Sequence, residues 1–130
     1  MKHQLVLSTE PIDEPALIQS RKMSSRMGAA ICFSGVVRGD EDGKRIRGIE
    51  YEAFGVMAEH QFHLIFDQVE QRWPIESIRL VHRLGFVPEN EPSLWVEVVA
   101  PHRREAFEAC QFVIEEMKRV VPIWKNPQFF

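Results

Sequence analysis

Apolar and polar residues follow two different periods along this chain, and the two periods divide it into strands and helices. Residues 3–8 (HQLVLS) predict a short strand. A helix follows, because Asp13 suits the N-cap position and Pro15 suits the first helical turn. The chain therefore opens with a strand and then a helix.

The next segment, residues 28–38 (GAAICFSGVVR), is almost wholly apolar and predicts a strand buried on both faces. Residues 39–44 are rich in Gly and Asp and predict a loop. Residues 46–54 alternate in their second half and predict another strand. Residues 56–73 carry apolar side chains at helical spacing up to Pro74, which indicates a long helix.

Two further strands are predicted at residues 75–87 and 92–101, joined by a polar loop at residues 88–92. A second long helix follows from about residue 103 to residue 120. The order is β-α-β-β-α-β-β-α. It predicts an α+β fold in which a mixed or antiparallel sheet packs against helices.

Composition adds limits to this picture. A chain of 130 residues with 45% hydrophobic residues predicts a single domain over residues 1–130, with one core. The formal charge of -3 gives no global field that would draw nucleic acid or an anionic membrane to the protein. Any bound anion must therefore be held by a local cluster of cations.

The chain contains two cysteines, Cys32 and Cys110, which lie far apart and lack the spacing of a metal site. Both fall in apolar stretches and are interpreted as inert core thiols. No N-terminal apolar run resembles a signal peptide or a membrane span, which favours a cytoplasmic location.

The C-terminal stretch MKRVVPIWKNPQFF carries the first candidate chemistry. Lys118 lies at the edge of the apolar stripe of the last predicted helix, so its stem can be buried while its ammonium emerges. Lys125 follows a Pro-Ile-Trp turn in which Trp124 is expected to pack. The alternatives are a lysine that borders the core and an exposed tail lysine.

A second cluster lies at the start of the same helix, where APHRREAF places His102 and Arg103 near free backbone N–H groups. Such a helix start favours a phosphate or another anion, although it can also be merely solvated. Arg38, at the end of the strand over residues 28–38, is either a surface cation or a ligand for a similar group.

The two clusters on this helix are separated by 16 residues, or about 24 Å of helix at roughly 1.5 Å per residue. One helix therefore cannot bring His102 and Lys118 to the same small molecule. If both bind one substrate, the second cluster must come from another copy of the chain, which predicts a homodimer with a shared site.

Several motifs resemble, in order and with compatible spacing, those of the large, catalytic subunit of molybdopterin synthase. The similarity covers residues 27 to 125, and its pieces are FSGVVRGDEDG, YEAFGVMAE, RWPIESIRLVHRLG, APHRREAFEAC and MKRVVPIWK. The resemblance implies an α/β-hammerhead-like fold and a dimer of large subunits. It also implies a small ubiquitin-like subunit at each outer end, a heterotetramer overall.

The resemblance also implies an activity. The C-terminal Gly-Gly thiocarboxylate of the small subunit would enter a pocket of this chain and deliver sulfur, and two such transfers would convert cyclic pyranopterin monophosphate into molybdopterin. The pyranopterin is a substrate, and no permanently bound cofactor or metal is expected. Membrane and nucleic acid are not expected as partners.

The family's site positions fall on the following residues of this sequence: Val36, Val37, Arg38, His102, Arg103, Lys118 and Lys125. By this resemblance the two lysines are catalytic and the full set binds substrate, with His102 and Arg103 reaching the opposite subunit's pocket. Lys118 is expected to take the more direct part, because a helix holds it more rigidly than a tail holds Lys125.

The sequence departs from the family pattern after Lys125, where the usual basic and acidic residues are replaced by NPQFF. Asn90 replaces a turn glycine, which Asn can do because it tolerates left-handed backbone angles. His82 shares its predicted strand face with Ile78 and Leu80 and is interpreted as structural.

Two other functions stay open from the sequence. The shortened tail suits a catalytically impaired dimeric scaffold that still binds the ubiquitin-like partner, although both lysines are retained. The scattered arginines suit a generic anion-binding or nucleic-acid-binding α+β domain, although the net charge is negative.

Overall fold

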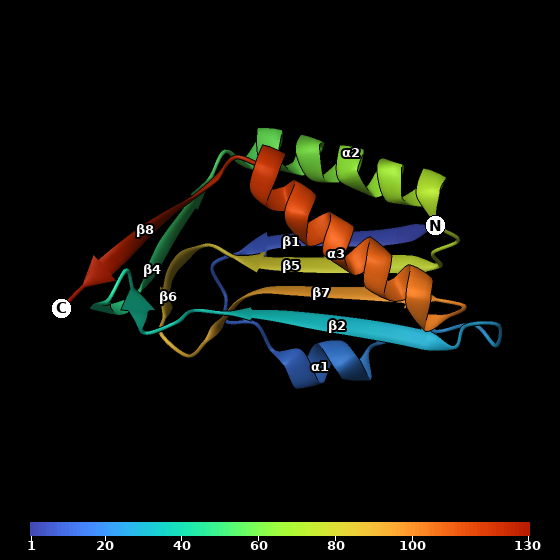
Figure 1. Cartoon of the computed structure of the whole chain (residues 1–130), viewed down its shortest axis with the longest axis horizontal. Helices are drawn as coiled ribbons and strands as arrows, with labels where there is room; N and C mark the ends of the chain where they lie inside the picture. Colours follow the sequence, from blue (N-terminus) through green and yellow to red (C-terminus); the bar gives the residue numbers. More distant parts are fainter.

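The structure is a computed structural model that describes residues 1–130 (Figure 1). It has three helices and eight strands. The helices are α1 (Glu14–Gln19), α2 (Gly55–Arg72) and α3 (Arg103–Val120). The strands are β1 (Lys2–Ser8), β2 (Ala29–Val36), β3 (Asp40–Glu41), β4 (Lys44–Ala53), β5 (Ser77–Arg83), β6 (Gly85–Pro88), β7 (Pro92–Ala100) and β8 (Ile123–Phe129).

Four strands form the larger sheet in the order β1-β5-β7-β2. The pair β1 and β5 is parallel, and the pairs β5–β7 and β7–β2 are antiparallel, so the sheet is mixed as predicted. Helices α2 and α3 cover one face, and the short α1 lies against the other (Figure 1). The α+β architecture predicted from the sequence is confirmed.

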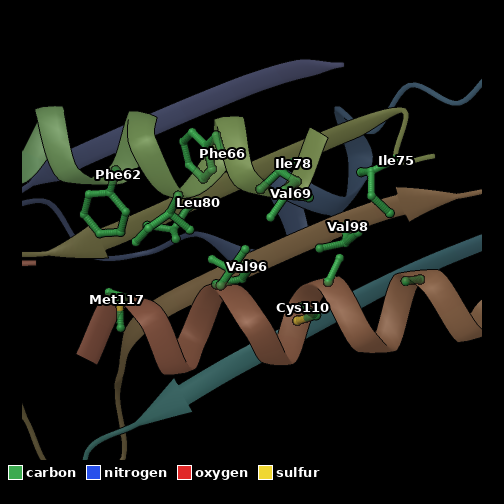
Figure 2. Close-up of a cluster of buried hydrophobic side chains, with 14 of the residues drawn as sticks. Phe62, Phe66, Val69, Ile75, Ile78, Leu80, Val96, Val98, Cys110 and Met117 are labelled. Atoms are coloured by element: carbon green, nitrogen blue, oxygen red, sulfur yellow. The ribbon is translucent and has the colours of Figure 1, made fainter. Parts of the chain in front are cut away.

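Alternation along the central strands builds the main core. Ile78 and Leu80 of β5 and Val96 and Val98 of β7 point toward the helices and have no exposed surface. Figure 2 shows them meeting side chains of α2 and α3. The apolar faces of α2 and α3 supply the other half of this core. This packing fixes the position of α3 and of the chain that follows its C-terminal end.

A smaller sheet forms at one end of the molecule, where β4 pairs with β3, β6 and β8 (Figure 1). It has its own core of five buried residues: Val37, Ile46, Ile49, Tyr51 and Val87. The two sheets are linked by the turn at Leu84, because Gly85 takes a positive φ of 79° that ends β5 and starts β6.

Two element predictions were wrong, and one strand was not predicted. The segment predicted as one strand over residues 75–87 is two strands in different sheets. The predicted loop over residues 39–44 contains the two-residue strand β3. The apolar tail after Pro122 is β8, an ordered strand paired with β4 from Ile46 to Ala53. Strands β6 and β8 depend on partners distant in sequence, and β3 depends on its hairpin with β4; local periodicity encodes neither kind of pairing.

The prediction that residues 28–38 are buried on both faces was also wrong. Strand β2 is the edge of the larger sheet, and Cys32, Phe33 and Val36 are exposed on it. The interpretation of Cys32 as a core thiol therefore fails, whereas Cys110 is buried in the main core as expected. Burial raises the pKa of the Cys110 thiol to about 11.

Two local predictions were confirmed. Asp13 caps α1 by accepting a hydrogen bond from the Ala16 amide, and Asn90 takes the left-handed backbone with φ of 69°. None of the helices is long and apolar enough to cross a membrane.

Candidate active site

A cavity of about 640 Å³ lies where the two sheets meet the C-terminal end of α3. Residues from β2, β3, β4, β5, β7, β8 and α3 line it, so segments far apart in sequence converge on one space. Five of the seven predicted site residues belong to this lining: Val36, Val37, Arg38, Lys118 and Lys125.

Lys118 is positioned by the last turn of α3. Met117 and Val121 on either side of it are 8% exposed and belong to the main core, so the backbone that carries Lys118 is fixed. The next residue, Arg119, forms an ion pair with Glu116 on the surface, with 2.7 Å between nitrogen and oxygen. Lys118 is itself exposed and forms no ion pair within the chain.

Lys125 is held by a strand, contrary to the expectation of a loosely held tail. It lies on β8 directly opposite Tyr51 of β4, and Ile123, two residues before it, also lines the cavity. Alternate residues of a strand point to opposite faces, so Trp124 lies on the outer face. There it packs edge-to-face on Phe54 with 5.0 Å between ring centroids and stays half exposed.

The end of β2 brings Arg38 to the cavity by way of a register shift between Gly35 and Val36. Val37 is anchored by two backbone bonds: its N–H donates to the Glu91 carbonyl at 3.0 Å, and its carbonyl accepts from the Asn90 N–H at 2.7 Å. The Val37 amide is thus already engaged and is not free to bind an anion. Its role in the cavity is to hold the backbone on which Arg38 stands.

His102 and Arg103 lie outside this cavity, at the opposite end of α3. His102 is the N-cap residue, its side chain is 80% exposed, and its Nδ1 is 3.8 Å from Oε1 of Glu105. The structure therefore agrees with the helix-length argument, because one copy of the chain does not bring the two basic clusters together.

The sequence interpretation missed a polar group on the floor of the cavity. The Tyr51 hydroxyl donates to Ser93 Oγ at 3.2 Å, and Ser93 Oγ donates to the Gly35 carbonyl at 3.4 Å. His82 packs edge-to-face on Tyr51 with 5.1 Å between ring centroids. His82 and Tyr51 face inward on their strands, and no local pattern distinguishes an inward residue that lines a cavity from one that fills a core.

Burial shifts the titration of both rings. It lowers the pKa of His82 below 6.5, an effect that the nearby Lys125 ammonium reinforces and the bond to the Arg83 carbonyl opposes. Burial also raises the pKa of Tyr51 above 10. Both side chains are accordingly uncharged near neutral pH, beside the cations Arg38, Lys118 and Lys125.

No group of three or more His, Cys, Asp or Glu side chains in the chain is arranged to hold a metal ion. The functional groups that line the cavity are amines, a guanidinium, a carboxylate on Glu41, hydroxyls and one imidazole. Such a set can bind anions, polarise a carbonyl and move protons.

Comparison with known proteins places this chain in a family. The family model described as "MoaE protein" matches residues 7–120. The molybdopterin synthase catalytic subunit of Thermoplasma volcanium is 38% identical over 118 residues, which cover 91% of this chain and 86% of that protein. The human catalytic subunit is 39% identical over 104 residues, and the chain spans 55% of its length.

Solved structures agree with the sequence comparison. The molybdopterin synthase structure from Staphylococcus aureus superposes with a TM-score of 0.86 at 31% identity, covering 98% of this chain and 90% of that one. A complex of subunits 1 and 2 of molybdopterin-converting factor from Helicobacter pylori has the same fold, with a TM-score of 0.76 at 21% identity over 98% of this chain and 88% of that one.

Proposed function

Because the chain belongs to the MoaE family, we propose that it is a molybdopterin synthase catalytic subunit. In this role it takes sulfur from the C-terminal thiocarboxylate of a small ubiquitin-like subunit and converts cyclic pyranopterin monophosphate into molybdopterin in two transfers. The pyranopterin is substrate, and the protein supplies only amino-acid side chains. Its place of action is the cytoplasm.

The observation that carries this proposal is the convergence of Lys118, Lys125 and Arg38 on one cavity from three separate segments. A thiocarboxylate and a phosphate monoester are both anions, and ammonium and guanidinium groups bind them and stabilise charge that develops during transfer. Lys118 and Lys125 stand on regular elements, so both can hold a reacting group in a defined position.

The edge strand β2 supports a dimer that completes this site. β2 pairs only with β7, and Phe33, Val36 and, on α3, Phe107 are exposed beside it. If a second copy paired its β2 antiparallel to this one, Ala29 of the second β2 would lie next to Val36 of the first. Ala29 pairs with Ala100, just before α3, so the partner's helix start would approach the cavity.

That arrangement brings the second basic cluster to the substrate. His102 and Arg103 of one copy would supply cations and the free N–H groups of the helix start to the pocket of the other, where a phosphate is expected. The ubiquitin-like subunit would then enter from the outer end, with its Gly-Gly tail in the cavity. The two-subunit complex of the structural neighbour supports the pairing of this chain with a small subunit.

The decisive experiment supplies the purified chain with a thiocarboxylated small subunit and the pyranopterin monophosphate and measures the dithiolene product. We expect product from the wild-type chain. Lys118→Ala should reduce its rate by about 100-fold or more, since a group that acts on developing charge is lost. Lys22→Ala removes an exposed lysine far from the cavity and serves as the control.

The result also separates this function from a scaffold that only binds. Tight binding of the small subunit by the wild-type chain without any product would support the impaired scaffold and would refute catalysis. Full activity of a folded Lys118→Ala variant would refute the role of Lys118. A steep loss of nucleic-acid binding with salt would instead favour the generic anion-binding domain.

A further inference from the structure

His82 stands at the floor of the cavity and takes no part in the chemistry described so far. It lies near the end of β5, is 4% exposed and belongs to the cavity lining. Its ring is oriented by two contacts, the edge-to-face packing on Tyr51 and a hydrogen bond at 2.9 Å between Nδ1 and the Arg83 carbonyl.

The bond to Arg83 determines which nitrogen of the neutral ring carries the proton. A carbonyl oxygen can only accept, so Nδ1 is the protonated nitrogen and Nε2 carries a free lone pair. Nε2 has no hydrogen-bond partner within the chain. It is also not fully buried, because the only fully buried side-chain polar atoms without a partner are Nε of Arg83 and Oε2 of Glu105. Nε2 of His82 therefore faces the open space of the cavity.

The neighbours of His82 keep this lone pair available. The strands on either side of β5 present only Leu7 and Leu94 opposite it, and β4 presents the neutral Tyr51. Lys125 of β8 is the nearby cation. Further charges of the cavity lining are those of Arg38, Glu41 and Lys118, and Arg83 next to the ring is paired with Glu91 at 2.8 Å.

The proposed reaction needs a proton acceptor at this place. When sulfur passes from the thiocarboxylate to the substrate, the carbonyl carbon of the small subunit stays joined to that sulfur as a thioester. The small subunit is freed only when water attacks that carbon. An attacking water must lose a proton, and an ammonium group can only donate one.

We propose that His82 is the general base of this release step, which rests on the function proposed above. Water adds to the thioester carbon through a new C–O bond while one of its protons passes to Nε2. The C–S bond then breaks with its electron pair left on sulfur. The products are the carboxylic acid of the small subunit, the substrate thiolate and the His82 imidazolium, which returns its proton to solvent.

The orientation of the ring suits this role. Burial and the Lys125 ammonium lower the pKa of His82 by more than the bond to the Arg83 carbonyl raises it, so the imidazolium passes its proton on quickly and the base is restored. A histidine retained only for packing would not need a lone pair directed into the space that holds the substrate.

The test follows the fate of the small subunit in a single turnover, by rapid quench and mass spectrometry. In His82→Gln, which keeps a polar side chain but cannot take up a proton, sulfur transfer should proceed while release slows by about 100-fold. A thioester between the small subunit and the substrate should then accumulate. His60→Gln, an exposed histidine of α2, should behave as the wild type.

Release by folded His82→Gln within about twofold of the wild-type rate would overturn the inference, and so would an adduct that accumulates in Glu41→Gln in its place. If the wild-type chain transfers no sulfur at all, the proposed function fails too. If sulfur transfer is intact and only the release results disagree, the role of His82 fails alone.

A measurement on the wild-type chain covers the case in which His82→Gln does not fold. Imidazole ¹⁵N chemical shifts report which ring nitrogen carries the proton. We expect Nδ1–H for the ring that titrates below pH 6.5. A protonated Nε2 at neutral pH would overturn the inference.

Discussion

At the scale of single residues, two groups of charged side chains have different surroundings. Arg38, Lys118 and Lys125 are directed into the cavity and form no ion pair within the chain. On the opposite face of the larger sheet, Glu97 is 1% exposed and bound by Arg79 Nε at 2.8 Å and Arg21 Nε at 2.7 Å. In the proposed function the first group binds ligands, and the second holds the sheet to the segment around α1.

Glu97 supplies a prediction about stability. Glu97→Gln leaves the two guanidiniums without their carboxylate, and we expect a loss of about 3 kcal/mol in the free energy of unfolding, measured with urea. This figure is the lower end for a buried pair, because both arginines are partly exposed. Glu108→Gln, on an exposed helix pair, should cost less than about 0.5 kcal/mol.

The same residue predicts a dependence on pH. Burial would raise the pKa of Glu97, but the hydrogen bonds from Arg79 and Arg21 outweigh it and hold the pKa below 4.5. A carboxylate with a depressed pKa stabilises the fold above its unfolded value and loses that contribution as the pH falls through its folded value. The difference between wild type and Glu97→Gln should therefore shrink in acid, and a constant difference would contradict this account.

At the scale of elements, β4 both lines the cavity and holds the smaller sheet together. It supplies Ile49 and Tyr51 to the cavity and pairs with β8, which carries Lys125. It also pairs with β6 at Gly48, where there is no room for a side chain. The position of Lys125 therefore depends on a tightly packed strand pair that lies outside the main core.

Gly48 makes this dependence testable. A Cβ at this position would lie 2.3 Å from the Val87 carbonyl oxygen and 2.7 Å from the Phe86 ring, so Gly48→Ala must displace backbone. We expect a loss of about 1–3 kcal/mol in unfolding free energy. Gly55→Ala, at the first residue of α2 with no atom within 4 Å, should be neutral or stabilising.

The activity of Gly48→Ala separates strand geometry from global stability. Because β4 and β8 carry one wall of the cavity, we expect its rate of product formation to fall even where circular dichroism shows the protein folded. Unchanged activity in a destabilised Gly48→Ala protein would show that the wall tolerates displacement of β4.

At the scale of the whole molecule, the predicted site residues are divided between two ends of one long helix. α3 is packed along its length into the main core, so its two ends cannot approach each other. The cavity at its C-terminal end holds the lysines, and the cluster at its N-terminal end is exposed. A second copy of the chain is the simplest source of the missing cations.

Mixed dimers test this division. Lys118→Ala subunits and subunits with both His102→Ala and Arg103→Ala should each be nearly inactive alone. In an equal mixture, half of the dimers contain one subunit of each kind, and each of these has one intact site. We expect about a quarter of wild-type activity after subunit exchange. Absence of any recovery in verified mixed dimers would contradict the shared site.

Much of the fold could be predicted from periodicity. The long helices, the strands over the main core and the N-cap at Asp13 follow from side-chain spacing and local hydrogen bonding. The strands β3, β6 and β8 could not be predicted in the same way, because each depends on pairing with β4. The exposure of β2 was missed because an apolar run does not reveal whether its strand lies at an edge.

The residues of the candidate site could likewise be predicted only in part. Residue types at the ends of predicted elements, together with motif resemblance, were enough to nominate Lys118, Lys125 and Arg38, which share the cavity. His82 and Tyr51 were not recognised as cavity residues, because the alternation of their strands predicts only that they face inward, as core residues do. The engagement of the Val37 amide also needed the structure, because its partner carbonyl is 54 residues away in sequence.

The sequence by itself determined the elements whose stabilising contacts are local or repeat with a fixed period, and it determined that one helix cannot join its two basic ends. Only the tertiary structure decided that the tail is a strand, that Lys125 lies opposite Tyr51, and that His82 lines the same cavity. The physical reason is that helical turns and caps are built from neighbours along the chain. Strand partners, cavities and buried hydrogen bonds are instead built from residues that only folding brings together.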